Sequence, residues 1–179
     1  MARPVMRGSL VGLYRPRVDD RREFLVAARA STEFHAEWVH PPLATGAYTE
    51  FLRRARAADR STFLARTLRE RTLVGVVNVS NIVGGSFANA TLGYYGFVGA
   101  TGGGRMTEAV RLAIDHCFAN LGLHRVEANI QPSNARSKAL VVRLGLRHEG
   151  FSPRLLEIGG QWRDHDRFAI TLEEWPQPR

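Results

Sequence analysis

The chain has 179 residues, 44% of them hydrophobic, which is enough to bury one core without a stapling disulfide or metal. Cys117 is its single cysteine, so no internal disulfide forms, and no apolar run reaches the ~20 residues that span a bilayer. The net charge of +8 favours anionic partners, such as a polyphosphate or nucleic acid. We predict one domain, residues 1–179, in a cytoplasmic protein that has no secretory signal and does not enter a membrane.

The chain begins with a predicted strand and helix. Residues 9–17 have the composition of a strand, and Asp19-Asp20 predict the cap of a helix that buries Phe24 and Leu25.

A loop is expected over residues 32–46, because Pro41-Pro42 stop any helix. It holds four ring side chains: Phe34, His35, Trp38 and His40. They either line a pocket or plug the space between two helices, and the sequence leaves both readings open. A second helix is expected over residues 48–58.

Two β-rich runs, residues 61–67 and 73–82, predict an antiparallel hairpin across the charged turn 69–71. Gly84-Gly85 then predict a turn into the next strand.

Residues 92–121 read as strand, glycine loop and helix. Aromatic and β-branched residues fill 92–98, and four glycines lie within 99–104. From residue 105 apolar side chains recur at helical spacing to 121. A helix that starts directly after a glycine loop offers unpaired N–H groups and partial positive charge, so phosphate is the leading ligand class.

The remaining chain predicts a strand over 125–130, a short helix over 134–144, and two strands within 146–172 that turn at Gly159-Gly160. A strand–helix–strand unit among hairpins predicts a mixed α/β (α+β) fold, with helices on the faces of one sheet.

Two glycine-loop chemistries fail on context. A Walker loop closes with Gly-Lys-Ser/Thr, whereas Arg105-Met106 follow the glycines here. A dinucleotide fingerprint belongs to the first strand of a parallel fold, and this loop follows several antiparallel candidates.

The loop from Thr101 to Met106 resembles the pyrophosphate signature Gln/Arg-x-x-Gly-x-Gly/Ala of the GNAT superfamily of N-acetyltransferases, with Thr101 and Met106 departing from it. Much of the chain resembles one branch, the RimJ-type acetyltransferases of ribosomal-protein N-termini. The segments that carry this likeness are Phe34 and Trp38, 80–83, 85–87, 92–94, Met106 with 108–109, 124–125, 128–129, Asn134, 136–137, 143–145 and 160–165.

The resemblance implies the GNAT fold, a mostly antiparallel sheet whose central strands splay apart to form an acetyl-CoA cleft. Backbone of the strand end is then expected to pair with the pantetheine arm, at Gly96, Phe97 and Val98. The loop and helix start are expected to hold the pyrophosphate, with these residues: Thr101, Gly102, Gly103, Gly104, Arg105 and Met106.

The resemblance also places Asn134 and Ser137 beside the thioester, in both cofactor binding and catalysis. Ser137 is expected to donate to the departing thiolate, although capping by Asn134 and a polar third position explain the same pair. Lys138 and Arg143 either reach the CoA phosphates or are solvated helix charges. No general base stands out: Tyr94 and Asn81 are expected to steer water, and Glu127 and Glu157 are candidates by chemistry.

The acceptor groove is expected to involve the following residues: Phe34, Trp38, Asn81, Trp162 and Asp164. Asp164 either anchors the substrate ammonium or pairs with Arg163 or Arg167. The histidines show no metal-ligand spacing, so we expect no metal.

Three functions compete at this stage. The first is acetylation of the N-terminal alanine, or another small residue, of a ribosomal protein, with contact to the ribosome or rRNA through the basic surface. The second is acetylation of a small amine such as a polyamine or aminoglycoside, and the third is a non-catalytic ribosome assembly factor. The oligomeric state stays open.

Overall fold

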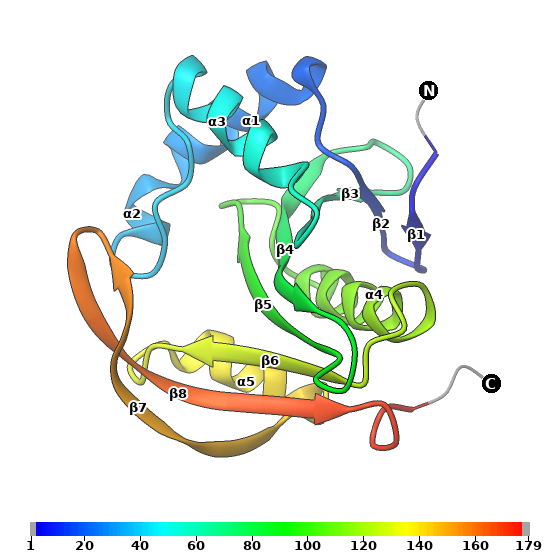
Figure 1. Cartoon of the computed structure of the whole chain (residues 1–179). Helices are drawn as coiled ribbons and strands as arrows, with labels where there is room; N and C mark the ends of the chain where they lie inside the picture. The colour runs from blue at the N-terminus through cyan, green and yellow to red at the C-terminus, as the bar shows by residue number, and fades with distance from the viewer. Residues whose placement is uncertain (1–2, 177–179) are drawn as a thin grey trace.

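The computed structural model describes residues 3–176. Its strands form a single sheet in the order β1-β2-β3-β4-β5-β6-β8-β7 (Figure 1). All neighbouring strands run antiparallel except β5 and β6, which are parallel. The prediction of a mixed, mostly antiparallel sheet with helices is therefore confirmed.

The strands are β1 (Met6–Arg7), β2 (Val11–Tyr14), β3 (Ser61–Thr67), β4 (Leu73–Val83), β5 (Asn89–Gly96), β6 (Arg125–Ile130), β7 (Arg147–Ile158) and β8 (Gln161–Thr171). The helices are η1 (Val18–Asp20), α1 (Arg21–Ala30), α2 (Thr32–His35), α3 (Thr45–Ala55), α4 (Arg105–Ala119) and α5 (Ala135–Arg143).

The sheet is covered on both faces because side chains alternate along its central strands. Phe63 belongs to the cluster under α4, whereas its neighbour Leu64 belongs to the cluster under α1 and α3. Figure 1 shows α1 and α3 side by side at one end, and α2 near the tip of the β7–β8 hairpin. This division places α4 and the α1–α3 group on opposite sides of β5.

The N-terminal strand differs from the prediction of residues 9–17. Only Val11–Tyr14 form β2, and a short β1 that the prediction missed pairs with it. The carboxylate of Glu108 accepts hydrogen bonds from the N–H groups of Ser9, Leu10 and Val11 at 2.7 to 2.9 Å. The backbone N–H groups where the strand was expected to begin are therefore bonded to a side chain of α4 and not to a neighbouring strand.

Two helix starts also differ. Asp20 makes no side-chain capping bond to α1; its carboxylate accepts from Arg17 N–H at 2.7 Å and pairs with Arg66 at 2.8 Å. Helix α3 begins at Thr45, three residues before the prediction.

The hairpin predictions are confirmed for β3 with β4 and for β7 with β8, the second turning at Gly159 and Gly160. Both glycines have positive φ, 60° and 76°, as a two-residue hairpin turn requires. No helix between residues 3 and 176 has the length and apolar content needed to cross a bilayer.

Candidate active site

The central feature is the divergence of β5 and β6. These parallel strands pair only from Asn89 with Arg125 to Leu92 with Ala128. Beyond that point β5 stays paired to β4 as far as Gly96, and β6 stays paired to β8 as far as Ile130. Each strand therefore keeps its outer partner and loses its inner one, which opens a wedge in the middle of the sheet, as the splayed-strand prediction requires.

The backbone that faces the wedge belongs to Tyr94 and Gly96. Phe97 N–H donates to Val74 O at 2.9 Å on the β4 side. Because backbone groups alternate in direction along a strand, those of Tyr94 and Gly96 point away from β4, into the wedge. Strand β5 ends at Gly96, two residues earlier than predicted, because the chain turns where Phe97 O accepts from the N–H groups of Ala100 and Thr101.

Two side chains of the α1–α2 segment reach this strand end. His35 Nε2 donates to Gly96 O at 2.7 Å, and Ser31 Oγ accepts from Val98 N–H at 2.9 Å. Both residues are buried, and burial lowers the pKa of His35 below its ordinary value, so its imidazole is held neutral. Three residues were predicted to pair with pantetheine: Gly96, Phe97 and Val98. In each of them one backbone group is already hydrogen-bonded within the protein.

The glycine loop opens the head of α4. Gly102, Gly103 and Gly104 have φ of 155°, 55° and 79°, and all three are exposed. No side chain caps the helix, and Arg105 N–H donates to Gly102 O at 3.1 Å, so within residues 3–176 the N–H groups of Met106 and Thr107 have no partner at its positive end. Thr101 packs on Gly96, whose ideal Cβ would lie 2.0 Å from Thr101 Cγ2. The exposed glycine backbone and the start of α4 together suit the binding of a diphosphate.

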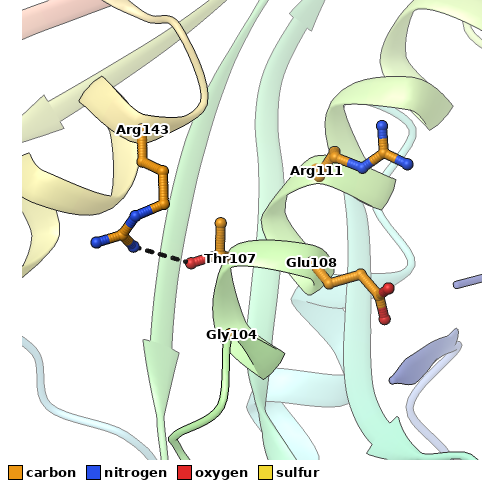
Figure 2. Close-up of a pocket in the computed structure, with 5 residues that line it drawn as sticks. All are labelled: Gly104, Thr107, Glu108, Arg111 and Arg143. Atoms are coloured by element: carbon orange, nitrogen blue, oxygen red, sulfur yellow. Dashed lines mark hydrogen bonds between the residues drawn. The ribbon is translucent and has the colours of Figure 1, made fainter. Parts of the chain in front are cut away.

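A cavity of about 490 Å³ adjoins that helix head, lined by Gly104, Thr107, Glu108, Arg111 and Arg143. Figure 2 shows Arg143 reaching from α5 to Thr107, where Nη1 donates to Oγ1 at 3.4 Å. The carboxylate of Glu108 accepts hydrogen bonds from the turn between β1 and β2. Burial raises the pKa of Glu108, but these hydrogen bonds lower it by more, so the net shift is downward. The two arginines therefore make the rim cationic.

Tyr94 and Ser137 bridge the wedge from β5 to α5. Tyr94 Oη lies 2.8 Å from Ser137 Oγ, and Asn134 Oδ1 accepts from Ser137 N–H at 3.1 Å as the cap of α5. Burial raises the pKa of Tyr94 to about 12, so the phenol keeps its proton. The capping interpretation of Asn134 is confirmed, while the hydroxyl of Ser137 remains in the wedge beside another hydroxyl.

The side chain of Lys138, the residue after Ser137, points toward β8. Its ammonium lies 3.2 Å from Asp166 of β8, so the charge is neutralised within the sheet.

A second cavity, of about 300 Å³, lies on the α3 side of the sheet. Strand residues form its floor: Thr62, Asn78, Ser80, Gly93 and Tyr95. Its walls come from the loop after α2, from helix α3 and from the residue just before β3: Val39, His40, Pro41, Pro42, Phe51, Arg54, Ala55 and Arg60. Because Gly93 follows the last residue of β5 that pairs with β6, this cavity borders the wedge.

The wedge and the glycine loop can be compared with known proteins. The family model of the acetyltransferase (GNAT) domain matches residues 11–147. The chain belongs to the GNAT acetyltransferase family. The family resemblance predicted from the loop is thereby confirmed.

Named relatives of this GNAT domain include ribosomal-protein acetyltransferases. It is 42% identical over 110 residues to the [ribosomal protein uS5]-alanine N-acetyltransferase of Escherichia coli, a match over 62% of this chain and 57% of that protein. The chain thus spans less than two thirds of that relative. The structure of Mycobacterium smegmatis RimJ in complex with CoA-disulfide superposes with a TM-score of 0.84 at 32% identity, over 93% of this chain and 84% of that one. A spermidine N-acetyltransferase of Vibrio cholerae, in complex with CoA and spermine, shares the fold at 18% identity and a TM-score of 0.78, over 93% and 98%.

The predicted acceptor residues of this GNAT domain do not all meet. Phe34 and Trp38 are half-buried and neither lines the second cavity, and the guanidinium of Arg136 lies over the Phe34 ring at 5.7 Å. Trp162 is 62% exposed near the hairpin tip. Asp164 accepts a hydrogen bond from Arg154 N–H at 2.7 Å, where β7 bulges. Its carboxylate stabilises the bulge, which neither sequence reading anticipated.

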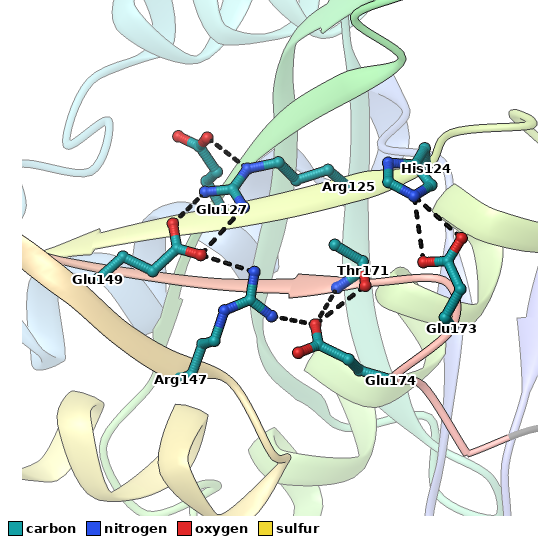
Figure 3. A network of polar contacts seen from close by, with 8 residues as sticks. All are labelled: His124, Arg125, Glu127, Arg147, Glu149, Thr171, Glu173 and Glu174. Carbon is teal, nitrogen blue, oxygen red and sulfur yellow. Dashed lines mark hydrogen bonds and ion pairs between the residues drawn. The ribbon is translucent and has the colours of Figure 1, made fainter.

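The candidates for steering or accepting a proton lie apart as well. Asn81 is exposed and has a φ of 53°. It lies in the bulge of β4, opposite the end of β5 that pairs with β6. Glu127 pairs with Arg125 at 2.8 Å, inside the ion network of Figure 3 that joins β6, β7 and β8. Glu157 is exposed on β7 and has no polar side-chain contact within residues 3–176.

Sequence reasoning overlooked Ser31, Arg54, Arg60 and Arg111, and did not separate His35 from its ring-bearing neighbours. Both readings of that ring cluster hold in part: His35 is buried against the strand, whereas His40 lines the second cavity. The proline pair was the available signal: α2 ends earlier, at His35, and Pro41 and Pro42 keep the chain before α3 in a loop that lines the second cavity. Between residues 3 and 176, no three histidine, cysteine or acidic side chains gather as metal ligands.

Proposed function

We propose that this protein transfers an acetyl group from acetyl-CoA to the α-amino group of a protein N-terminus, with a ribosomal protein that begins with alanine or another small residue as acceptor. The observation that carries the proposal is the wedge between β5 and β6, with the glycine loop at the head of α4 beside it. The 42% identity to an enzyme named for the alanine of ribosomal protein uS5 supports the acceptor class.

The chain holds acetyl-CoA with two groups of residues. Amides of Gly102, Gly103 and Gly104 bind the diphosphate, and Arg143 supplies a cation at the same helix head. The backbone of Tyr94 and the N–H group of Gly96 face the arm that enters the wedge, since Gly96 O already accepts from His35. Acetyl-CoA supplies the acetyl group as a thioester.

The hydroxyl of Ser137 is the proton donor of the proposed site. It lies at the wedge 2.8 Å from Tyr94 Oη, and the neutral phenol is able to replace the proton that Ser137 gives to the departing sulfur, after which water returns a proton to Tyr94. Cys117 does not compete as a nucleophile, because it lies on the buried face of α4 and burial raises its pKa to about 12. The acceptor amine therefore attacks directly.

An α-amino acceptor suits a site without a strong base. Its unperturbed pKa is ~8 and that of lysine is ~10.4, so freeing a lysine amine at pH 7 costs roughly 3 kcal/mol more. The carboxylate of Glu127 is held in an ion pair with Arg125. Water leading to bulk solvent accepts the proton.

The charge of the second cavity disfavours a polyamine. Two arginines line it and no carboxylate does. A polycation entering there meets like charge, whereas a peptide with one α-amine does not.

The test compares acceptors directly. Purified protein and acetyl-CoA are incubated with octapeptides that start with Ala, Ser or Met, with the same peptides blocked at the α-amine, and with spermidine. We expect acetylated Ala and Ser peptides by mass spectrometry, and none from the blocked set. Faster acetylation of spermidine than of every peptide contradicts the proposal, as does RNA binding without any acetyl transfer. Mass spectrometry of ribosomal proteins from cells with and without this chain then identifies the acceptor.

A further inference from the structure

The second cavity is lined by charge of one sign. Arg54 of α3 and Arg60, just before β3, contribute guanidinium groups, and none of the lining side chains is acidic. Their side chains are 58% and 37% exposed, so an incoming ligand can reach both. A guanidinium binds a carboxylate through two parallel hydrogen bonds.

Each arginine makes only a long ion pair with a neighbouring carboxylate. The carboxylate of Glu50 accepts two hydrogen bonds from Arg53 at 2.7 Å, which leaves Arg54 Nε 3.7 Å away. Arg60 Nε lies 3.9 Å from Asp59, beyond hydrogen-bonding distance. Neither guanidinium donates a hydrogen bond to any of residues 3–176, in contrast to Arg66, which lies between Asp20 and Glu23.

A row of strand positions leads from the wedge toward these arginines. Gly93 of β5 is in register with Asn78 of β4, and Asn78 is in register with Thr62 of β3. Gly93 has no side chain to block the row. Asn78 Oδ1 accepts from Thr62 at 3.0 Å, which leaves its amide N–H groups for a peptide carbonyl.

The row sets a distance along the acceptor. Two strand spacings of about 4.8 Å separate β5 from β3, so the row spans about 10 Å. An extended chain rises about 3.3 Å per residue, so three residues cover that distance. An amine at the wedge therefore places the third or fourth residue near Thr62, which lines the same cavity as Arg54 and Arg60.

We propose that the acceptor N-terminus carries an aspartate or glutamate at its third or fourth residue, and that Arg54 and Arg60 bind this carboxylate. The inference rests on the proposed N-terminal acetylation and narrows its substrates to acidic N-terminal segments.

The experiment uses octapeptides that begin with Ala and carry Glu, Gln or Lys at position 3 or 4, with no other charged side chain. For the wild type we expect kcat/KM about tenfold higher with Glu than with Gln, through a lower KM, as a charge-assisted hydrogen bond predicts. Lys peptides should be the poorest.

Matched variants assign the preference. In the double variant R54Q/R60Q the Glu-to-Gln ratio should fall to about 1, and R54E/R60E should favour Lys peptides. Arg56→Gln, the same change on an exposed neighbour outside the cavity, should keep the ratio. CoA binding shows that each variant is folded.

Two results overturn the inference and leave the proposed function intact: equal kcat/KM for Glu and Gln peptides in the wild type, or an unchanged ratio in R54Q/R60Q. Where the variants do not fold, the wild-type comparison decides. If CoA binds but no peptide is acetylated, the proposed function fails and this inference fails with it.

Discussion

The imidazole of His35 is hydrogen-bonded through Nε2 to the carbonyl oxygen of Gly96, 2.7 Å away and 61 residues later in the chain. This contact ties α2 to the last residue of β5, at the open end of the wedge. The ring also packs edge-on against Tyr95 and Phe97, with centroids 5.4 and 5.9 Å apart. The α2 segment, whose following loop covers the second cavity, is thus anchored to the strand proposed to bind acetyl-CoA.

Replacing His35 tests that anchor. His35→Phe keeps an aromatic ring and leaves Gly96 O without its donor, and an unpaired buried acceptor costs about 1–3 kcal/mol of unfolding free energy. Urea unfolding measures the loss. His124→Phe is the control, because His124 is 54% exposed and its contact with Glu173 is a surface pair worth less than about 1 kcal/mol. Equal losses in both variants would show that the buried contact adds nothing.

Stability should depend on pH through two buried histidines. Burial lowers the pKa of both His35 and His116, so the native state binds fewer protons than the unfolded chain once pH drops below the unfolded value of about 6.5. The contribution of these histidines to the unfolding free energy should therefore be fully present above pH 6.5. It should decline as the pH falls below 6.5 toward their depressed native pKa values. Urea midpoints at pH 5.5, 6.5 and 7.5 measure this decline, which should be shallower in His35→Phe. A flat profile in the wild type would contradict the assignment.

The hydroxyl pair at the wedge predicts a non-additive loss of rate. Ser137→Ala should lower kcat about 10²-fold with little change in KM for acetyl-CoA, because it removes the proposed acid. Tyr94→Phe should cost about tenfold, since it removes a partner of Ser137. The double variant should be no slower than Ser137→Ala alone, because Tyr94 acts through Ser137. Multiplying effects would mean that the two hydroxyls act independently.

The cationic rim of α4 predicts a loss of cofactor affinity. Arg143→Gln should weaken CoA binding about fivefold, and the difference should shrink at high salt because the arginine is exposed. Titration calorimetry with CoA measures both. Arg22→Gln, an equal loss of charge on exposed α1 residues across the sheet, should leave the affinity unchanged. If both variants weaken binding alike, the effect comes from net charge alone.

Local patterns were sufficient to predict most elements. Two β-rich runs on either side of a charged turn predicted the β3–β4 hairpin, and Gly159-Gly160 predicted the turn between β7 and β8, because both depend on neighbours in sequence. The glycine loop before α4 predicted an anion site for the same reason: helix ends and glycine backbones carry their chemistry locally. The family likeness rested on these segments.

Contacts between distant segments had no such local signal. The sequence by itself determined most of the strands and helices, the character of the glycine loop and the family, although it missed β1 and predicted a loop where α2 lies. Only the tertiary structure decided that His35 meets Gly96, that Lys138 and Asp164 are used within the protein, and that Arg54 and Arg60 face the row leading to Gly93. The physical reason is that a charged or polar side chain binds whichever partner packing brings within about 3 Å, and spacing along the chain does not specify that partner.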